Sequence, residues 1–231
     1  MDQHFLTPSF SPRSIVVFAG HPEHPEAPNS MARTLLAQMK DQGYAGEVTH
    51  LDIEMTGTLS DLAHSRADLV IIALPHDRIA AALEIAGRIR CRAALVLSSG
   101  LESSPCAELQ TIARRHGVHL LGPNSLGFQR PQLKLNASAL GPLAAPGPLG
   151  LVSQSGALTA SILDWAQHNG VGFSTVVSLG PNTGVDLPQV LDFLAMDGQT
   201  QSILVYMEGI RSSRRFMSAL RAAAYAKPVV V

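Results

Sequence analysis

The chain has 231 residues, which is enough for one large domain or two modest ones. Apolar residues make up 46% of it, charged residues 15%, and the formal net charge is -1. This balance excludes the basic surface of a nucleic-acid or anionic-membrane binder, and no apolar run is long enough to span a bilayer. With no signal peptide and no metal or redox spacing at Cys91 or Cys106, we expect a cytoplasmic protein with reduced thiols.

The first half alternates apolar strands with amphipathic helices. Strands are predicted over 14–20, 47–53, 67–75, 93–100 and 118–124, with helices over 29–42, 76–89 and 105–116. Strands this apolar, separated by helices, are typical of a parallel sheet covered on both faces. The sequence therefore predicts an α/β fold with a doubly wound, Rossmann-like first domain over residues 1–140.

The segment 141–150 is rich in proline and glycine and carries no charge. We predict an inter-domain linker there, which is neither helix nor interior strand. Strands and helices then alternate again over 151–231, which predicts a second parallel-sheet domain. Because the chain ends within an apolar strand, we expect this domain to be incomplete and the chain to be a fragment.

Ligands of open α/β sheets bind at the carboxyl ends of the strands, so the residues that follow each strand carry the functional information. After the first strand, a dinucleotide-binding loop would have the pattern Gly-x-Gly-x-x-Gly, and only Gly20 matches it. The histidines and glutamates over 21–26 suggest a metal site, but a charged surface loop explains them equally well. Asp52 either binds a dinucleotide ribose or is a solvated strand end.

Small or polar residues also follow the next three strands, at Pro75, at Ser98–Gly100 and at Asn124. Turn geometry alone explains each of them, because asparagine and glycine tolerate left-handed backbone. Together on one sheet edge they indicate a ligand crevice.

The stretch from Ser153 to Gly170 joins a strand to a helix over 155–169. Leu158, Ile162 and Trp165 have the spacing of one buried helix face, and Gly170 is suited to a C-terminal cap. The serines then lie at the helix N-terminus, where Ser155 is either a simple cap or part of an anion site. A serine nucleophile is disfavoured, since the Gly-x-Ser-x-Gly turn is absent.

Two acidic residues follow the later strands. Asp186 is suited to cap the helix that begins at Leu187. Glu208 is either solvated or able to orient a catalytic histidine or act as a base.

In this order, LLGPNSLG (120–127), LGLVSQSGAL (149–158), LDFLAMDGQTQSILVYMEGI (191–210) and AKPVVV (226–231) resemble the NDP-forming acyl-CoA synthetase family, which includes the succinyl-CoA synthetase alpha subunit. Within the family, LNAS (135–138), ILDWAQ (162–167) and RRFMSALRAAAYAKP (214–228) look most like the synthetase-like part of Pat-type protein lysine acetyltransferases. Those are long chains that carry an additional acetyltransferase domain.

The resemblance implies a CoA-binding first domain and a flavodoxin-like ligase domain. It implies that coenzyme A or acyl-CoA and phosphate bind here, with ATP or ADP in the full-length protein, through an acyl phosphate and a phosphorylated histidine. It also implies a partner, either further domains of the same protein or a beta subunit. The implied phosphate-binding residues are Ser153, Gln154, Ser155 and Gly156; the implied partner of the histidine is Glu208; the implied CoA contacts are Gly20, Pro75, Ser99, Gly100 and Asn124.

This sequence departs from the family in two ways. No histidine of the chain aligns with the phosphorylated one, so we expect that the chain alone does not complete the reaction. The first loop is proline-rich rather than glycine-rich, and Asp52 and Glu54 would repel the 3′-phosphate of CoA. Two alternatives therefore stay open, an NAD-binding module and a catalytically silent regulatory module that forms a homo-oligomer.

Overall fold

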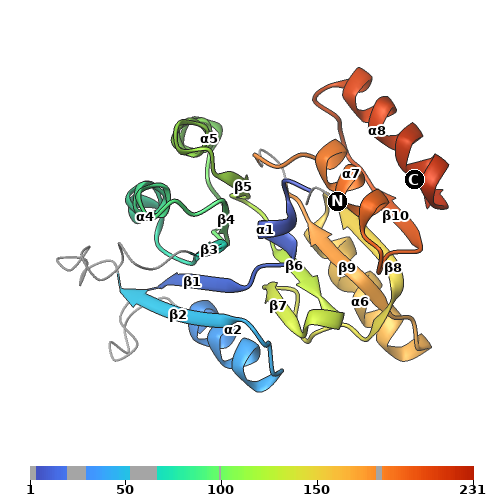
Figure 1. The fold of residues 1–231 in the computed structure, drawn as a ribbon, viewed down its shortest axis with the longest axis horizontal. Helices are drawn as coiled ribbons and strands as arrows, with labels where there is room; N and C mark the ends of the chain where they lie inside the picture. Colours follow the sequence, from blue (N-terminus) through green and yellow to red (C-terminus); the bar gives the residue numbers. More distant parts are fainter. Residues whose placement is uncertain (1–3, 20–29, 53–66, 99, 181–183) are drawn as a thin grey trace.

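The structure is a computed structural model that describes residues 4–19, 30–52, 67–98, 100–180 and 184–231. Its strands form two sheets, and short α1 (Thr7–Phe10) lies between them (Figure 1). Sheet A contains, in spatial order, β2 (Glu47–Asp52), β1 (Ser14–Ala19), β3 (Leu69–Ile72), β4 (Ala93–Val96) and β5 (His119–Leu121). All of its neighbouring strands are parallel, which confirms the predicted α/β class for this half.

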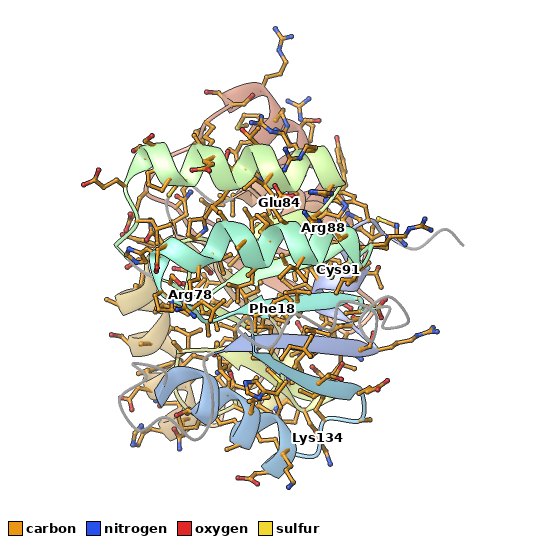
Figure 2. The ribbon with its side chains drawn as sticks, turned by 90° about the vertical axis from the view of Figure 1, so that its left-hand side faces the viewer. Phe18, Arg78, Glu84, Arg88, Cys91 and Lys134 are labelled. Carbon is orange, nitrogen blue, oxygen red and sulfur yellow. The ribbon has the colours of Figure 1, made fainter. Side chains whose placement is uncertain are left out.

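Helices cover both faces of sheet A because its strands are apolar on both sides. On one face lie α4 (His76–Arg88) and α5 (Ser103–His116), side by side in Figure 2. Ile79 and Leu83 of α4 pack there against Val70 and Ile72 of β3. On the other face lie α1 and α2 (Ser30–Asp41).

Sheet B is mixed, where the sequence predicted a purely parallel second sheet. In spatial order it contains β11 (Val229–Val230), β10 (Ser202–Tyr206), β8 (Pro146–Ser153), β9 (Phe173–Ser178), β6 (Gly127–Arg130) and β7 (Leu135–Ser138). The first four are parallel, whereas β6 runs antiparallel to both β9 and β7. A short 3-10 helix, η2 (Pro131–Leu133), joins β6 to β7.

The predicted linker 141–150 is wrong in its second half, since residues 146–150 belong to β8 inside sheet B. Proline is tolerated at the start of a strand or at a bulge, and the pairing of β8 with β9 shifts register between Pro146 and Leu149. From Gly150 onward β8 is buried. The strands also divide between the sheets earlier than residue 140, because β6 and β7 join sheet B.

Three helices flank sheet B: α6 (Gly156–Asn169), α7 (Leu187–Met196) and α8 (Ser213–Ala226). A single apolar cluster joins one face of sheet A to α7, α8 and sheet B, while α6 covers a smaller cluster on its own. The bounds of α6 and its left-handed cap at Gly170 confirm the prediction. The predicted buried face is wrong at Trp165, whose side chain is 59% exposed, whereas Thr159 and Ala166 are buried.

Candidate functional site

The topology of sheet B singles out one point at its carboxyl edge. Strand β8 lies between β9 and β10, so the chain leaves β8 toward one side and later returns on the other. Ligands of doubly wound sheets bind where the connections diverge in this way. Gln154 follows β8 and Glu208 lies just after β10, so two predicted site residues meet at this switch point.

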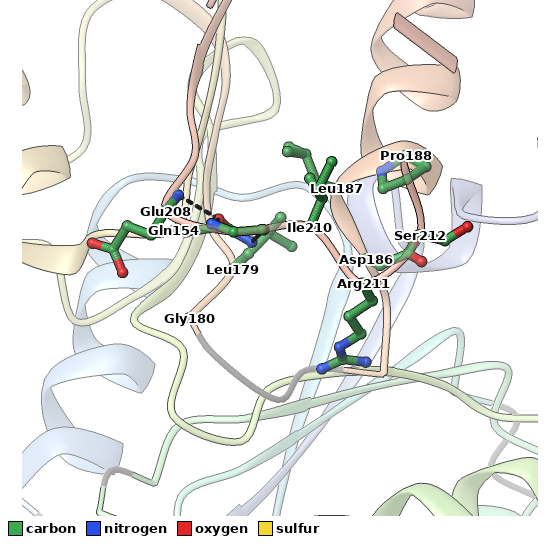
Figure 3. A pocket seen from close by; sticks show the side chains of 11 residues that line it. Gln154, Leu179, Gly180, Asp186, Leu187, Pro188, Glu208, Ile210, Arg211 and Ser212 are labelled. Carbon is green, nitrogen blue, oxygen red and sulfur yellow. Dashed lines mark hydrogen bonds between the residues drawn. The ribbon is translucent and has the colours of Figure 1, made fainter. Parts of the chain in front are cut away.

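A cavity of about 390 Å³ lies at this edge (Figure 3). It is bounded by residues that follow β8, β9 and β10 and by the start of α7. Its lining residues are Gln154, Leu179, Gly180, Asp186, Leu187, Pro188, Glu208, Gly209, Ile210, Arg211 and Ser212.

The two predicted serines are used to form the β8–α6 turn. The Ser153 hydroxyl is fully buried; it lies 3.0 Å from the Ser155 carbonyl oxygen and accepts from the Ser155 amide at 3.1 Å. Ser155 is the N-cap of α6, and its hydroxyl accepts from the Leu158 amide at 3.3 Å. Both hydroxyls therefore hydrogen-bond to the backbone of the turn itself, and these bonds do not point either hydroxyl toward a ligand.

The start of α6 nevertheless presents unused donors. Across the described ranges, no residue accepts a hydrogen bond from the amide of Gly156 or Ala157. Unpaired amides at a helix N-terminus, together with the helix dipole, favour an anion. A side chain at Gly156 would also crowd Leu126, because an added Cβ would lie 2.5 Å from Leu126 Cδ1.

The Gln154 side chain crosses from β8 to the segment that follows β10. Its Oε1 accepts from the amides of Glu208 and Gly209 at 2.7 Å and 3.0 Å, and its Nε2 donates to the Gly209 carbonyl at 2.9 Å. The Glu208 carboxylate is exposed, and Figure 3 shows it pointing away from Leu187 and Pro188. The side chain of Gln154, a predicted phosphate-binding residue, is therefore bonded to the backbone of Glu208, the predicted catalytic residue.

Sequence reasoning missed Arg211, which lines the cavity. No described residue forms an ion pair with it, so its charge is available to an anionic occupant. Asp186 is the predicted cap of α7 and forms a full capping box with Gln189, besides an ion pair with Arg215 at 3.1 Å. A lone arginine in a loop has no sequence signal that distinguishes it from a solvated one.

The carboxyl edge of sheet A brings together three predicted CoA contacts. Pro75 and Gly100 are exposed there, and Gly100 has open space around its Cα. Asn124 has a positive φ of 60°, and its side-chain amide pairs with the Leu101 backbone at 3.0 Å and 2.9 Å. Asn124 thus holds two loops of this edge together.

Gly20, Ser99, Glu54, the Asp52 side chain and the 21–26 loop lie outside what the structure describes. In the described ranges, no three His, Cys, Asp or Glu residues are grouped to hold a metal ion. Nor is any helix of those ranges long and apolar enough to cross a membrane. Cys91 and Cys106 are buried and unpaired, and burial raises the pKa of the Cys91 thiol to about 12.

Comparison with known proteins gives consistent results. Residues 146–231 match the succinyl-CoA ligase like flavodoxin domain. Over 96% of its length the chain is 32% identical to acetate–CoA ligase (ADP-forming) I of Archaeoglobus fulgidus, of which it covers 33%. Over 96% of its length it is also 31% identical to the alpha subunit of acetate–CoA ligase (ADP-forming) I of Pyrococcus furiosus, of which it covers 51%.

A solved structure has the same fold over nearly the whole chain. It is the dinucleotide forming acetyl-coenzyme A synthetase 1 of Ca. Korarchaeum cryptofilum in complex with phosphate and ADP, with a TM-score of 0.86 and 26% identity. The match covers 97% of this chain and 50% of that one. The chain thus spans between a third and about half of the length of these three proteins.

The paired sheets, with the β8–α6 turn at a switch point, define an α/β protein with a Rossmann-like and a flavodoxin-like unit. By sequence and fold the chain belongs to the NDP-forming acyl-CoA synthetase family.

Proposed function

We propose that this chain forms the part of an NDP-forming acyl-CoA synthetase that binds CoA or acyl-CoA and the transferred phosphoryl group. The observation that carries the proposal is the pair of unused amides at the start of α6, beside the Glu208 segment at the switch point of sheet B. The family membership supports it independently, since six of the curated relatives that match are ADP-forming CoA ligases.

In the proposed reaction, acyl-CoA and inorganic phosphate give an acyl phosphate and free CoA. The phosphoryl group passes to a histidine with release of the acid, and then to a nucleoside diphosphate, which becomes the triphosphate. Because the chain spans about half or less of the length of these relatives, we propose the complete reaction for a larger protein or assembly. ATP or ADP, and further domains or a beta subunit, belong to that assembly.

The described residues suit distinct roles in this scheme. The amides of Gly156 and Ala157 donate to phosphoryl oxygens. Arg211 lines the cavity that begins at the neighbouring Gln154, and in this proposal it neutralises part of the phosphoryl charge. Glu208 accepts a hydrogen bond from the phosphorylated histidine and so fixes the orientation of its ring. Ser153 and Ser155 hold the turn in the shape that exposes the two amides.

We propose that CoA lies along the carboxyl edge of sheet A. There Pro75 and Gly100 leave the edge open, and Asn124 holds the edge in shape. Gly20 and Ser99 are proposed contacts on the resemblance alone. The Pat-type origin and a homo-oligomeric state also stay predictions.

Calorimetry on the unmodified chain tests the proposal. Titrations with inorganic phosphate, acetyl-CoA and NAD should give binding heats for phosphate and acetyl-CoA and none for NAD. Binding of NAD without any response to CoA or phosphate would support the dinucleotide-binding alternative. The absence of all three heats, with self-association in sedimentation, would support the silent regulatory module.

A further inference from the structure

The segment that follows β10 has little to hold it apart from Gln154. Residues 207–211 are all exposed, and nothing lies within 4 Å of the position that a side chain on Gly209 would take. The amides of Glu208 and Gly209 both donate to Gln154 Oε1, and within the described ranges they have no other acceptor. The Gln154 amide itself donates to the Tyr206 carbonyl at 3.1 Å, which continues the pairing of β8 with β10.

The side chain makes this link with both of its polar atoms. Gln154 Oε1 serves two donors, while Nε2 donates to the Gly209 carbonyl, so a three-bond bridge closes over the Glu208–Gly209 peptide. Such a bridge fixes the rotation of that peptide as well as its position. Since the backbone of Glu208 is fixed at the base of its side chain, the bridge restricts where the carboxylate can reach.

We propose that Gln154 is a positioning residue that holds the Glu208 carboxylate at a set place relative to the first turn of α6. This inference rests on the proposed function, because it is there that Glu208 has its role toward a histidine. It also changes the role of Gln154, whose side chain acts on the β10 segment rather than on phosphate. Glutamine suits the task because it combines an acceptor for two amides with a donor for a carbonyl.

A set of variants separates hydrogen bonding from packing. Gln154→Met keeps nearly the same volume but loses all three bonds, whereas Gln154→Glu keeps the acceptor for the two amides and loses the donor. Gln189→Met is the matched control, because Gln189 also accepts a backbone hydrogen bond beside the cavity, from the Asp186 amide at 2.9 Å. Amide hydrogen exchange by NMR is measured on each variant of the full chain.

We expect the amides of Glu208 and Gly209 to exchange about tenfold faster in Gln154→Met, the effect of losing about one net hydrogen bond's stabilisation. Their protection should return in Gln154→Glu and stay unchanged in Gln189→Met. A side chain that acts only by packing would leave both amides equally protected in Gln154→Met and Gln154→Glu, because methionine and glutamate have nearly the same volume as glutamine.

Unchanged exchange at both amides in Gln154→Met would overturn the inference. Phosphate binding by the unmodified chain is measured in parallel, by calorimetry. If phosphate does not bind, the proposed function fails, while the exchange data still decide whether Gln154 holds the segment.

Discussion

At the scale of single residues, Gly156 meets two requirements at once. A Cβ at this position would lie 2.5 Å from Leu126 Cδ1, and the Gly156 amide has no acceptor within the described ranges. The resemblance implied a phosphate-binding role for Gly156, and the packing against Leu126 is a second, independent reason for a glycine there. A pair of substitutions separates the two.

We predict that Gly156→Pro weakens phosphate binding about tenfold relative to Gly156→Ala, because it removes one donor to a charged group. Both variants introduce the same Cβ, so the crowding of Leu126 is matched between them. Proline is tolerated at the first position of a helix, and the extended backbone of Ser155 (φ -105°, ψ 116°) suits the residue before a proline. Equal phosphate affinity of the two variants, measured by calorimetry, would place the anion elsewhere.

The same junction marks the limit of prediction at this scale. Spacing alone put Ser153, Gln154, Ser155 and Gly156 at a strand–helix turn, and the structure has them there. The spacing did not predict that the Ser153 hydroxyl forms hydrogen bonds with the Ser155 backbone. A hydroxyl that serves its own turn and one that serves a ligand look alike in a sequence, because only the dihedral angles distinguish them.

At the scale of elements, the hairpin of β6 and β7 escaped prediction because its strands are short and bury polar side chains beside the apolar ones. Gln129, Asn136 and Ser138 lie in these two strands and are almost fully buried. Their polar atoms form hydrogen bonds with one another and with the segment that follows β7. Gln129 Nε2 donates to Ser138 Oγ at 3.3 Å and to the Pro142 carbonyl at 3.0 Å. Each strand has four residues, which is the lower length limit at which an alternation of apolar and polar side chains indicates a strand.

We predict that Gln129→Leu lowers the free energy of unfolding by about 2 kcal/mol, because it removes buried hydrogen bonds and leaves partners unsatisfied. The Ala144 amide loses its acceptor at 3.0 Å, and Ser138 and Pro142 lose their donor. Urea unfolding followed by circular dichroism measures the change. Gln132→Leu is the control, since Gln132 is exposed with one bond to Gly147, and its effect should be under about 0.5 kcal/mol.

Elements with strong periodicity were predicted well, whereas their orientation was not. The strands of sheet A and the ends of α6 follow the pattern of apolar and capping residues. Trp165 was assigned to the buried face of α6, yet the helix turns the smaller Thr159 and Ala166 inward. Small residues let a helix approach the sheet closely, and a pattern that scores only hydrophobicity ranks the tryptophan above them.

At the scale of the whole molecule, the chain's N-terminal residues connect the two sheets. Phe10 of α1 contacts Phe128 of β6 and Phe193 of α7, with ring centroids 5.1 Å and 4.9 Å apart. His4 lies against Phe5 and Phe193, and Phe5 in turn contacts His119 of β5. No local pattern predicts this packing, because its partners are more than a hundred residues apart in the sequence.

Two histidines of this junction give the stability a pH dependence. Burial lowers the pKa of His4 and of His119 below 6.5; the two histidines repel each other, Arg92 adds to the lowering at His119, and Asp192 opposes it at His4. In addition, His4 Nδ1 accepts from the Leu6 amide at 3.1 Å, which requires an unprotonated nitrogen. The unfolded chain therefore binds more protons than the folded protein just below pH 6.5.

We predict that the free energy of unfolding falls as the pH decreases from about 7.5 to about 5.5, since stability rises with pH wherever the unfolded state binds more protons. The range stops there because burial raises the pKa of Asp192, which contributes with the opposite sign at lower pH. Urea titrations of the natural chain and of the His4→Gln/His119→Gln variant measure the slope, which should be flatter in the variant. His168→Gln, at a histidine with a side chain 73% exposed, should keep the natural slope. Equal slopes in all three proteins would show that the junction does not sense protons.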